Sequence, residues 1–246
     1  MVSSIVGMAS LNKKIFWVAM FSVSMAFLES AVVIYLRELY YPEGFSFPLK
    51  TLSEKIIVTE LFRELATLFM MISIAFIVAT RKHERFSWFI FVFGIWDILY
   101  YVFLKIFLDW PETLFTWDVL FLLPSTWVGP VICPIINSLS MIIIAMMVLL
   151  PGKMGFKPSI AKWEWVLLIA GAVLVFISYT EEYYFYINSE FDISEIMLYS
   201  TNDALIEFSS QFVPQHFRWG LFISGQLLFI GMMIIYGRRK FRKNIL

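Results

Sequence analysis

The chain has 246 residues, of which 60% are apolar, 19% are aromatic and only 15% are charged, and its mean hydropathy is +0.79. These values lie well outside the range of soluble globular proteins. The formal net charge is 0, which excludes a strongly basic, nucleic-acid-binding chain, so the composition predicts a polytopic integral membrane protein.

Six stretches are long and apolar enough to cross a bilayer, which takes about 20 mostly apolar residues in an α-helix. We therefore expect a single all-α domain over residues 1–246, a polytopic transmembrane helical bundle. The predicted spans lie at about 15–40, 56–80, 86–108, 118–150, 163–187 and 217–237.

Positive charge gathers on one side of this predicted bundle. Thirteen of the nineteen basic residues fall before the first span, after the second, after the fourth, or after the last. By the positive-inside rule this side faces the cytoplasm. We expect a multi-pass protein of the cytoplasmic membrane with both termini in the cytoplasm. The thirteen residues are Lys13, Lys14, Arg81, Lys82, Arg85, Lys153, Lys157, Lys162, Arg238, Arg239, Lys240, Arg242 and Lys243.

Charged residues also occur inside the predicted spans. Glu60, Arg63 and Glu64 follow an i, i+3, i+4 spacing that puts them on one face of the second helix. Glu29 in the first span and Asp97 in the third lie at overlapping depths. A charge at bilayer depth is costly and usually faces a bundle interior or a wet cavity. We therefore predict that these three helices turn their charges toward one another.

Two interpretations of this cluster stay open. Its carboxylates nearly balance three basic residues, Arg37, Arg63 and Lys105, which is typical of a structural ion-pair network that holds helices in register. A carboxylate left without a cation would instead carry a proton or bind a ligand. The residues predicted for such a pocket are Glu29, Glu60, Arg63, Glu64, Asp97, Tyr101 and Asp118.

The fourth predicted span is broken by prolines. Pro124, Pro130 and Pro134 interrupt its apolar run, and each proline inside a helix removes a backbone donor. We expect a short half-helix that begins at Asp118, then a bend, then a regular span over about 135–150. Such a break is typical either of an ion-binding site in a transporter or of a simple kink.

Close packing is predicted for the sixth span. Gly220, Ser224 and Gly231 are small residues that let another helix approach. We expect this role to be structural.

Motifs for several chemistries are missing from the sequence. The single cysteine, Cys133, excludes an internal disulfide, and His83 and His216 lie too far apart in predicted depth for a shared metal. No nucleotide-binding glycine loop, Walker pattern or nucleophile elbow occurs. We therefore predict no metal and no cofactor.

Five short stretches in the first four spans resemble a family of uncharacterised polytopic integral membrane proteins of prokaryotes. The resemblance implies that the charged outer half of these spans is the shared feature, and it brings no activity to transfer. The stretches are 28–45 (LESAVVIYLRELYYPEGF), 60–66 (ELFRELA), 93–101 (FGIWDILYY), 117–124 (WDVLFLLP) and 127–131 (WVGPV).

Three functions remain open at this point. The first is a small-solute or ion transporter, with Glu64 and Asp97 as proton or cation sites and Arg63 as their counter-ion. The second is a membrane-embedded enzyme acting on a lipid or isoprenoid, since carboxylates near aromatic residues can serve as acid and base. The third is a non-catalytic assembly subunit. The expected partners are the lipid bilayer and a small solute, cation or lipid ligand, without nucleic acid; the oligomeric state stays open.

Overall fold

The computed structural model describes residues 2–151, 159–191 and 203–243. Within these ranges it contains seven helices and one two-stranded hairpin. Six of the helices are long and apolar enough to cross a membrane, which confirms the predicted all-α bundle and makes the chain a polytopic membrane protein. The elements are α1 (Val2–Tyr40), α2 (Glu54–Val78), α3 (Lys82–Leu108), β1 (Trp117–Phe121), β2 (Trp127–Pro130), α4 (Ile132–Leu149), α5 (Lys162–Ile187), α7 (Asp203–Ser210) and α8 (Trp219–Lys243).

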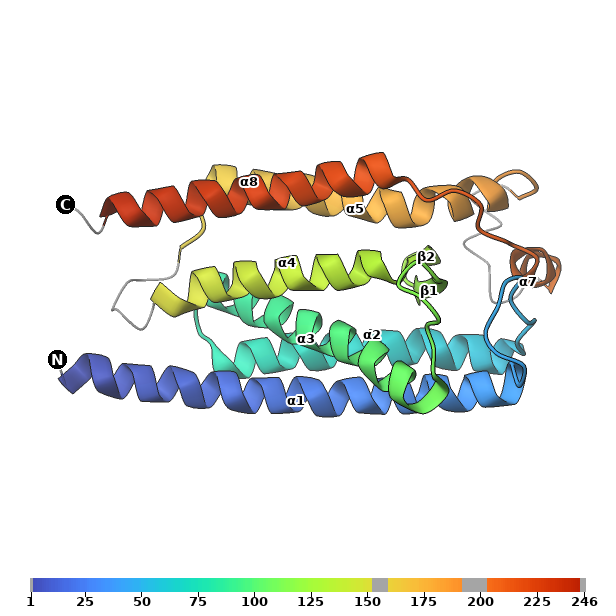
Figure 1. Ribbon diagram of the computed structural model, residues 1–246, viewed down its shortest axis with the longest axis horizontal. Helices are drawn as coiled ribbons and strands as arrows, with labels where there is room; N and C mark the ends of the chain where they lie inside the picture. Colours follow the sequence, from blue (N-terminus) through green and yellow to red (C-terminus); the bar gives the residue numbers. More distant parts are fainter. Residues whose placement is uncertain (1, 152–158, 192–202, 244–246) are drawn as a thin grey trace.

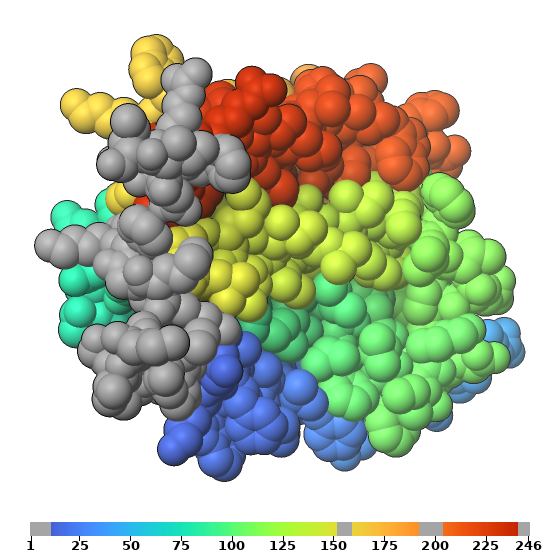
Figure 2. Space-filling view, turned by 60° about the vertical axis from the view of Figure 1, so that its left-hand side comes forward, coloured from blue at the N-terminus to red at the C-terminus, as the bar shows by residue number. Residues whose placement is uncertain are grey.

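The six long helices run along one axis in two groups (Figure 1). The first group holds α1, α2 and α3, and the second holds α5 and α8. Between them lies α4, which packs against α3 on one side and α8 on the other. Figure 2 shows the same order on one face of the molecule, with α4 between the red α8 and the green α3.

The two ends of the bundle differ. Both chain termini lie at one end, which we call the terminal end, while the hairpin and α7 lie at the opposite one, the hairpin end (Figure 1). At the terminal end the Lys14 ammonium donates a hydrogen bond to the carbonyl of Val78 at 2.9 Å. There, too, Arg239 of α8 forms a 2.7 Å ion pair with the fully buried Glu164 of α5. These contacts tie neighbouring helices together where the basic residues gather.

Residues 117–130 form an antiparallel β-hairpin, so the half-helix expected to begin at Asp118 was a wrong prediction. Trp117 pairs with Pro130 and Val119 with Val128. The strands are short, and apolar β-branched and aromatic residues favour extended backbone. The fourth span is consequently only α4, which begins at Ile132.

The prolines separate elements here and do not bend a long helix. Pro124 lies between the two strands, and Pro130 ends β2, where a missing donor is tolerated. Pro134 lies in the first turn of α4, where its N–H would have no intrahelical acceptor. The break that the prolines predict is confirmed, but a hairpin lies before it where the sequence predicts a half-helix.

The hairpin packs against the hairpin end of α5. The Trp127 and Tyr179 rings stack with their centroids 5.8 Å apart. A Cβ on Gly129 would lie 3.1 Å from atoms of both Tyr179 and Phe217, so glycine permits this close approach. One side of the hairpin is thereby held by the second helix group, which leaves Asp118 and Leu122 directed at the first group.

Helices α5 and α8 approach each other closely. A Cβ on Gly225 would lie 2.8 Å from the carbonyl oxygen of Gly171 and 2.7 Å from the Val175 side chain. The glycines singled out from sequence, Gly220 and Gly231, would meet nothing within 4 Å. The prediction of close packing on this helix therefore named the wrong glycines.

We expect Gly225→Ala to lower the free energy of unfolding by about 1–3 kcal/mol, because the added methyl overlaps the α5 backbone. The matched control is Gly231→Ala in the same helix, which adds a methyl into open space and removes a flexible residue from a helix interior. Thermal unfolding in detergent measures both changes. A Gly225→Ala protein as stable as Gly231→Ala would contradict the close packing of α5 on α8.

Candidate binding cavity

A cavity of about 190 Å³ lies among α1, α2, α3 and the hairpin. We call it the carboxylate cavity. The structure brings all seven residues of the predicted pocket to its wall; that they bind a ligand stays a prediction. These residues are Glu29, Glu60, Arg63, Glu64, Asp97, Tyr101 and Asp118.

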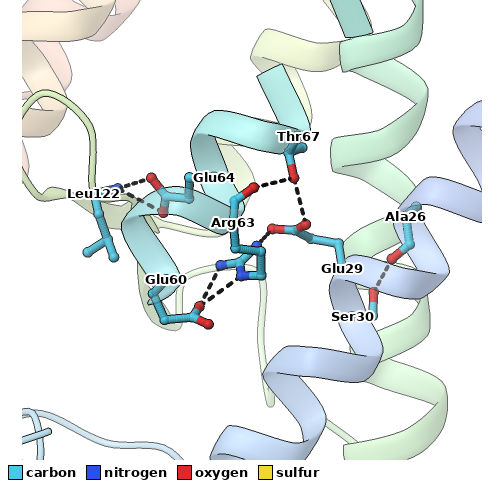
Figure 3. A network of polar contacts seen from close by, with 8 residues as sticks. All are labelled: Ala26, Glu29, Ser30, Glu60, Arg63, Glu64, Thr67 and Leu122. Atoms are coloured by element: carbon cyan, nitrogen blue, oxygen red, sulfur yellow. Dashed lines mark hydrogen bonds and ion pairs between the residues drawn. The ribbon is translucent and has the colours of Figure 1, made fainter. Parts of the chain in front are cut away.

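One charged network joins α1 to α2 (Figure 3). Arg63 lies between two carboxylates and donates to Glu60 from Nε and Nη2, at 2.9 and 2.7 Å. Its Nη1 forms an ion pair with Glu29. The Thr67 hydroxyl donates to the other oxygen of Glu29 at 3.1 Å. The i, i+3, i+7 spacing of the α2 residues puts them on the one face that can reach α1.

A second network holds the hairpin in the bundle. Arg37 of α1 donates from Nη2 to Oδ1 of Asp118 at 2.9 Å. The hydroxyl of Tyr101 donates to Oδ2 at 3.2 Å. The guanidinium of Arg37 also lies 3.7 Å from the ring centroid of Trp110 and 4.3 Å from that of Phe45. With Asp118 only 1% exposed, this pair connects α1, α3 and β1 away from solvent.

Two carboxylates on the same wall form no ion pair with a described residue. Both oxygens of Glu64 accept a hydrogen bond from the backbone N–H of Leu122, at 3.0 and 2.9 Å. Asp97 accepts one from the hydroxyl of Ser138 at 2.6 Å. Neither forms an ion pair with any part of the chain that the structure describes. In Figure 3, Glu64 points away from Arg63 and toward the hairpin.

The near balance of charge expected from sequence was wrong. Lys105 does not line the cavity, because its ammonium pairs with Asp109 at 2.7 Å and donates to the Pro111 carbonyl at 3.1 Å. Two guanidinium groups, those of Arg37 and Arg63, are therefore left to offset the five carboxylates. Lys50 also lines the cavity, but this residue is exposed.

Two buried donors near the cavity lack a partner among the described residues. Nη1 of Arg37 and Nε1 of Trp96 have no acceptor there, although both residues line the cavity through other atoms. Buried donors are normally satisfied, but these two atoms have almost no accessible surface and are not open to a solute in the cavity.

Some contributors were missed from sequence. Arg37 was counted among the charges but not assigned to the pocket, although it follows Glu29 by eight residues and so shares its helix face. Nothing in the sequence indicates that Ser138 belongs to the site, since a serine in an apolar helix is common. The backbone N–H of Leu122 reaches Glu64 only because the hairpin forms. No residue type in this stretch predicts that contact.

A metal centre is not evident. No group of three His, Cys, Asp or Glu side chains that could hold a metal ion occurs in residues 2–151, 159–191 and 203–243. The carboxylates and guanidinium groups that line the cavity can hold a proton, a cation or a polar solute.

Comparisons of the chain with protein-family models, with curated proteins and with solved structures gave no match. The resemblance to a prokaryotic membrane-protein family thus stays a prediction. Function has to be inferred from the geometry of the cavity.

We expect Arg63→Gln to lower the free energy of unfolding by about 3–5 kcal/mol, because it leaves Glu29 and Glu60 buried without their shared cation. Arg81→Gln is the matched control, since Arg81 is half exposed and lies 3.6 Å from Glu84, where a surface pair contributes about 0–1 kcal/mol. Thermal unfolding of both variants in detergent tests this. Equal stabilities would show that the Arg63 network contributes nothing to the fold.

Proposed function

We propose that this protein is a proton-coupled transporter of small cations in the cytoplasmic membrane, and that the carboxylate cavity is its substrate site. One observation carries the proposal: Glu64 and Asp97 line the cavity without a cationic partner. The other three carboxylates are already paired with Arg37 or Arg63.

A carboxylate far from water is costly in its charged form unless something neutralises it. A proton and a bound cation are the two ways to do so. Glu64 and Asp97 can alternate between them, so that binding of a cation releases a proton. This exchange is the elementary step of cation transport coupled to protons.

Charge and shape favour a small organic cation. The wall carries five carboxylates against two guanidinium groups and the exposed ammonium of Lys50, and this surplus of acidic groups disfavours an anion. The aromatic rings of Trp96 and Tyr100 also line the cavity, and aromatic faces attract alkylammonium groups. A volume of about 190 Å³ suits a solute of a few heavy atoms.

The hairpin can couple the occupancy of the carboxylate cavity to a conformational change. An ionised Glu64 holds the N–H of Leu122 with both oxygens. When a proton or cation occupies that carboxylate, its hold on the hairpin changes, because hydrogen bonds to a charged acceptor are the stronger ones. Transport requires an element whose conformation depends on whether the site binds a proton or a cation.

Orientation follows from charge. We infer that the terminal end faces the cytoplasm, because the basic residues gather there. The carboxylate cavity, near the hairpin end, would then receive its substrate from the outer side.

The test uses purified protein in liposomes that contain a pH dye and tetramethylammonium. After dilution into buffer without this cation, we expect the lumen pH to change as cation and proton exchange. Glu64→Gln and Asp97→Asn should each slow this change at least about tenfold, since each removes a group that neutralisation requires.

The control is Glu54→Gln, a carboxylate exposed in the first turn of the same helix as Glu64. It should retain the wild-type rate. Absence of any pH change with tetramethylammonium, sodium or potassium gradients would overturn the proposal.

A second candidate, an enzyme acting on a lipid, is favoured by an apolar cavity that adjoins the carboxylates. This candidate predicts that a lipid is missing or accumulates in extracts of a strain lacking the protein. The transporter predicts that no reaction product is missing from such extracts.

A further inference from the structure

A second cavity of about 310 Å³ adjoins the carboxylate cavity. We call it the apolar cavity. The two cavities meet along a common wall to which α2, the α1–α2 connection and the hairpin contribute. The residues that line both are Leu49, Lys50, Leu52, Glu60 and Leu122.

The apolar cavity offers little polar recognition of its own. Its walls come from α2, α5, α7 and the end of the hairpin, with Ile57 and Leu61 facing Tyr183, Ile187 and Ile206. Its charged lining residues are Lys50 and Glu60, both shared with the carboxylate cavity. The remaining polar groups are hydroxyls. A lining of this kind fits a hydrocarbon chain.

The end of this cavity near α7 is held together by hydrogen bonds. The Thr51 hydroxyl, ahead of α2, donates to that of Ser210 at the end of α7, at 3.1 Å. The Ser209 hydroxyl donates to the Ile206 carbonyl at 2.8 Å. These three hydroxyls are engaged with the protein, so at this end the cavity provides mainly apolar contact; the hydroxyls of Ser125 and Thr126 line its hairpin side.

We infer that the substrate is an amphiphilic amine whose cationic head occupies the carboxylate cavity and whose hydrocarbon chain occupies the apolar cavity. This inference rests on the proposed function and adds a substrate class to it. Glu60 and Leu122 lie where head and chain join. An amphiphile of this kind partitions into the bilayer, and α2 and α5 both line the apolar cavity in which its chain would lie.

Two ligands distinguish the contribution of the head to binding from that of the chain. Tetramethylammonium and decyltrimethylammonium have the same cationic head, and only the second has a hydrocarbon chain. Their binding is measured with radiolabelled ligands on protein in lipid nanodiscs. Partition into the lipid is the same for every variant, so differences between variants report the protein alone.

Leu61→Trp fills the apolar cavity. We expect it to weaken decyltrimethylammonium binding at least about tenfold, equivalent to about 1.4 kcal/mol, and to leave tetramethylammonium binding unchanged. Glu64→Gln should weaken both ligands. The control is Phe62→Trp, the adjacent residue on α2, which is 67% exposed and lines neither cavity; it should alter neither.

The outcomes are distinct. If Leu61→Trp affects both ligands equally or neither, the chain does not lie in the apolar cavity and the inference is overturned, while cation transport stands. If Glu64→Gln affects neither ligand, the proposed function itself fails. Should Leu61→Trp not fold, the smaller change Ile57→Phe, on the same wall, decides between these outcomes.

Discussion

Charge placed at membrane depth has to be neutralised, and this constraint organises the half of the bundle near the hairpin. Arg37 on α1 and Asp118 neutralise each other in an ion pair, and this pair brings the hairpin into the bundle. Arg63 forms ion pairs with both Glu29 and Glu60, and these pairs join α2 to α1. Without these pairs the same residues would be costly in a bilayer, so the arrangement of three helices and the hairpin depends on them.

The same constraint separates the carboxylates that have a guanidinium partner from those that do not. The structural network and the functional pocket first appeared as alternatives, but each accounts for different residues. Three carboxylates have a guanidinium partner, while Glu64 and Asp97 have only neutral donors, Leu122 N–H and the Ser138 hydroxyl. We therefore attribute stability to the paired groups and exchange of protons and cations to the other two.

The sequence predicted much of the site because helical spacing is regular. Glu60, Arg63 and Glu64 had to share a face, and that face had to avoid lipid. The hairpin was not predictable in this way, since an apolar run with prolines fits a broken helix and a pair of strands equally well. The partner of Lys105 also depended on the turn after α3, where Asp109 comes back within reach. Helical periodicity predicts which residues share a face, but the contacts made by the turn after α3 and by the hairpin cannot be predicted from it.

If Glu64 and Asp97 exchange protons and cations, they do not have to hold the fold together. Thermal unfolding in detergent of Glu64→Gln, Asp97→Asn and Asp118→Asn distinguishes the two groups of carboxylates. The first two variants keep an oxygen that can accept from the Leu122 N–H or the Ser138 hydroxyl. Asp118→Asn keeps only one of the two oxygens that accept from Arg37 and Tyr101. We predict that Asp118→Asn loses about 3–5 kcal/mol, because Arg37 is left without its carboxylate. The first two variants should be as stable as the wild type or more so. A loss of similar size in all three would contradict the account and make the whole cluster a structural network.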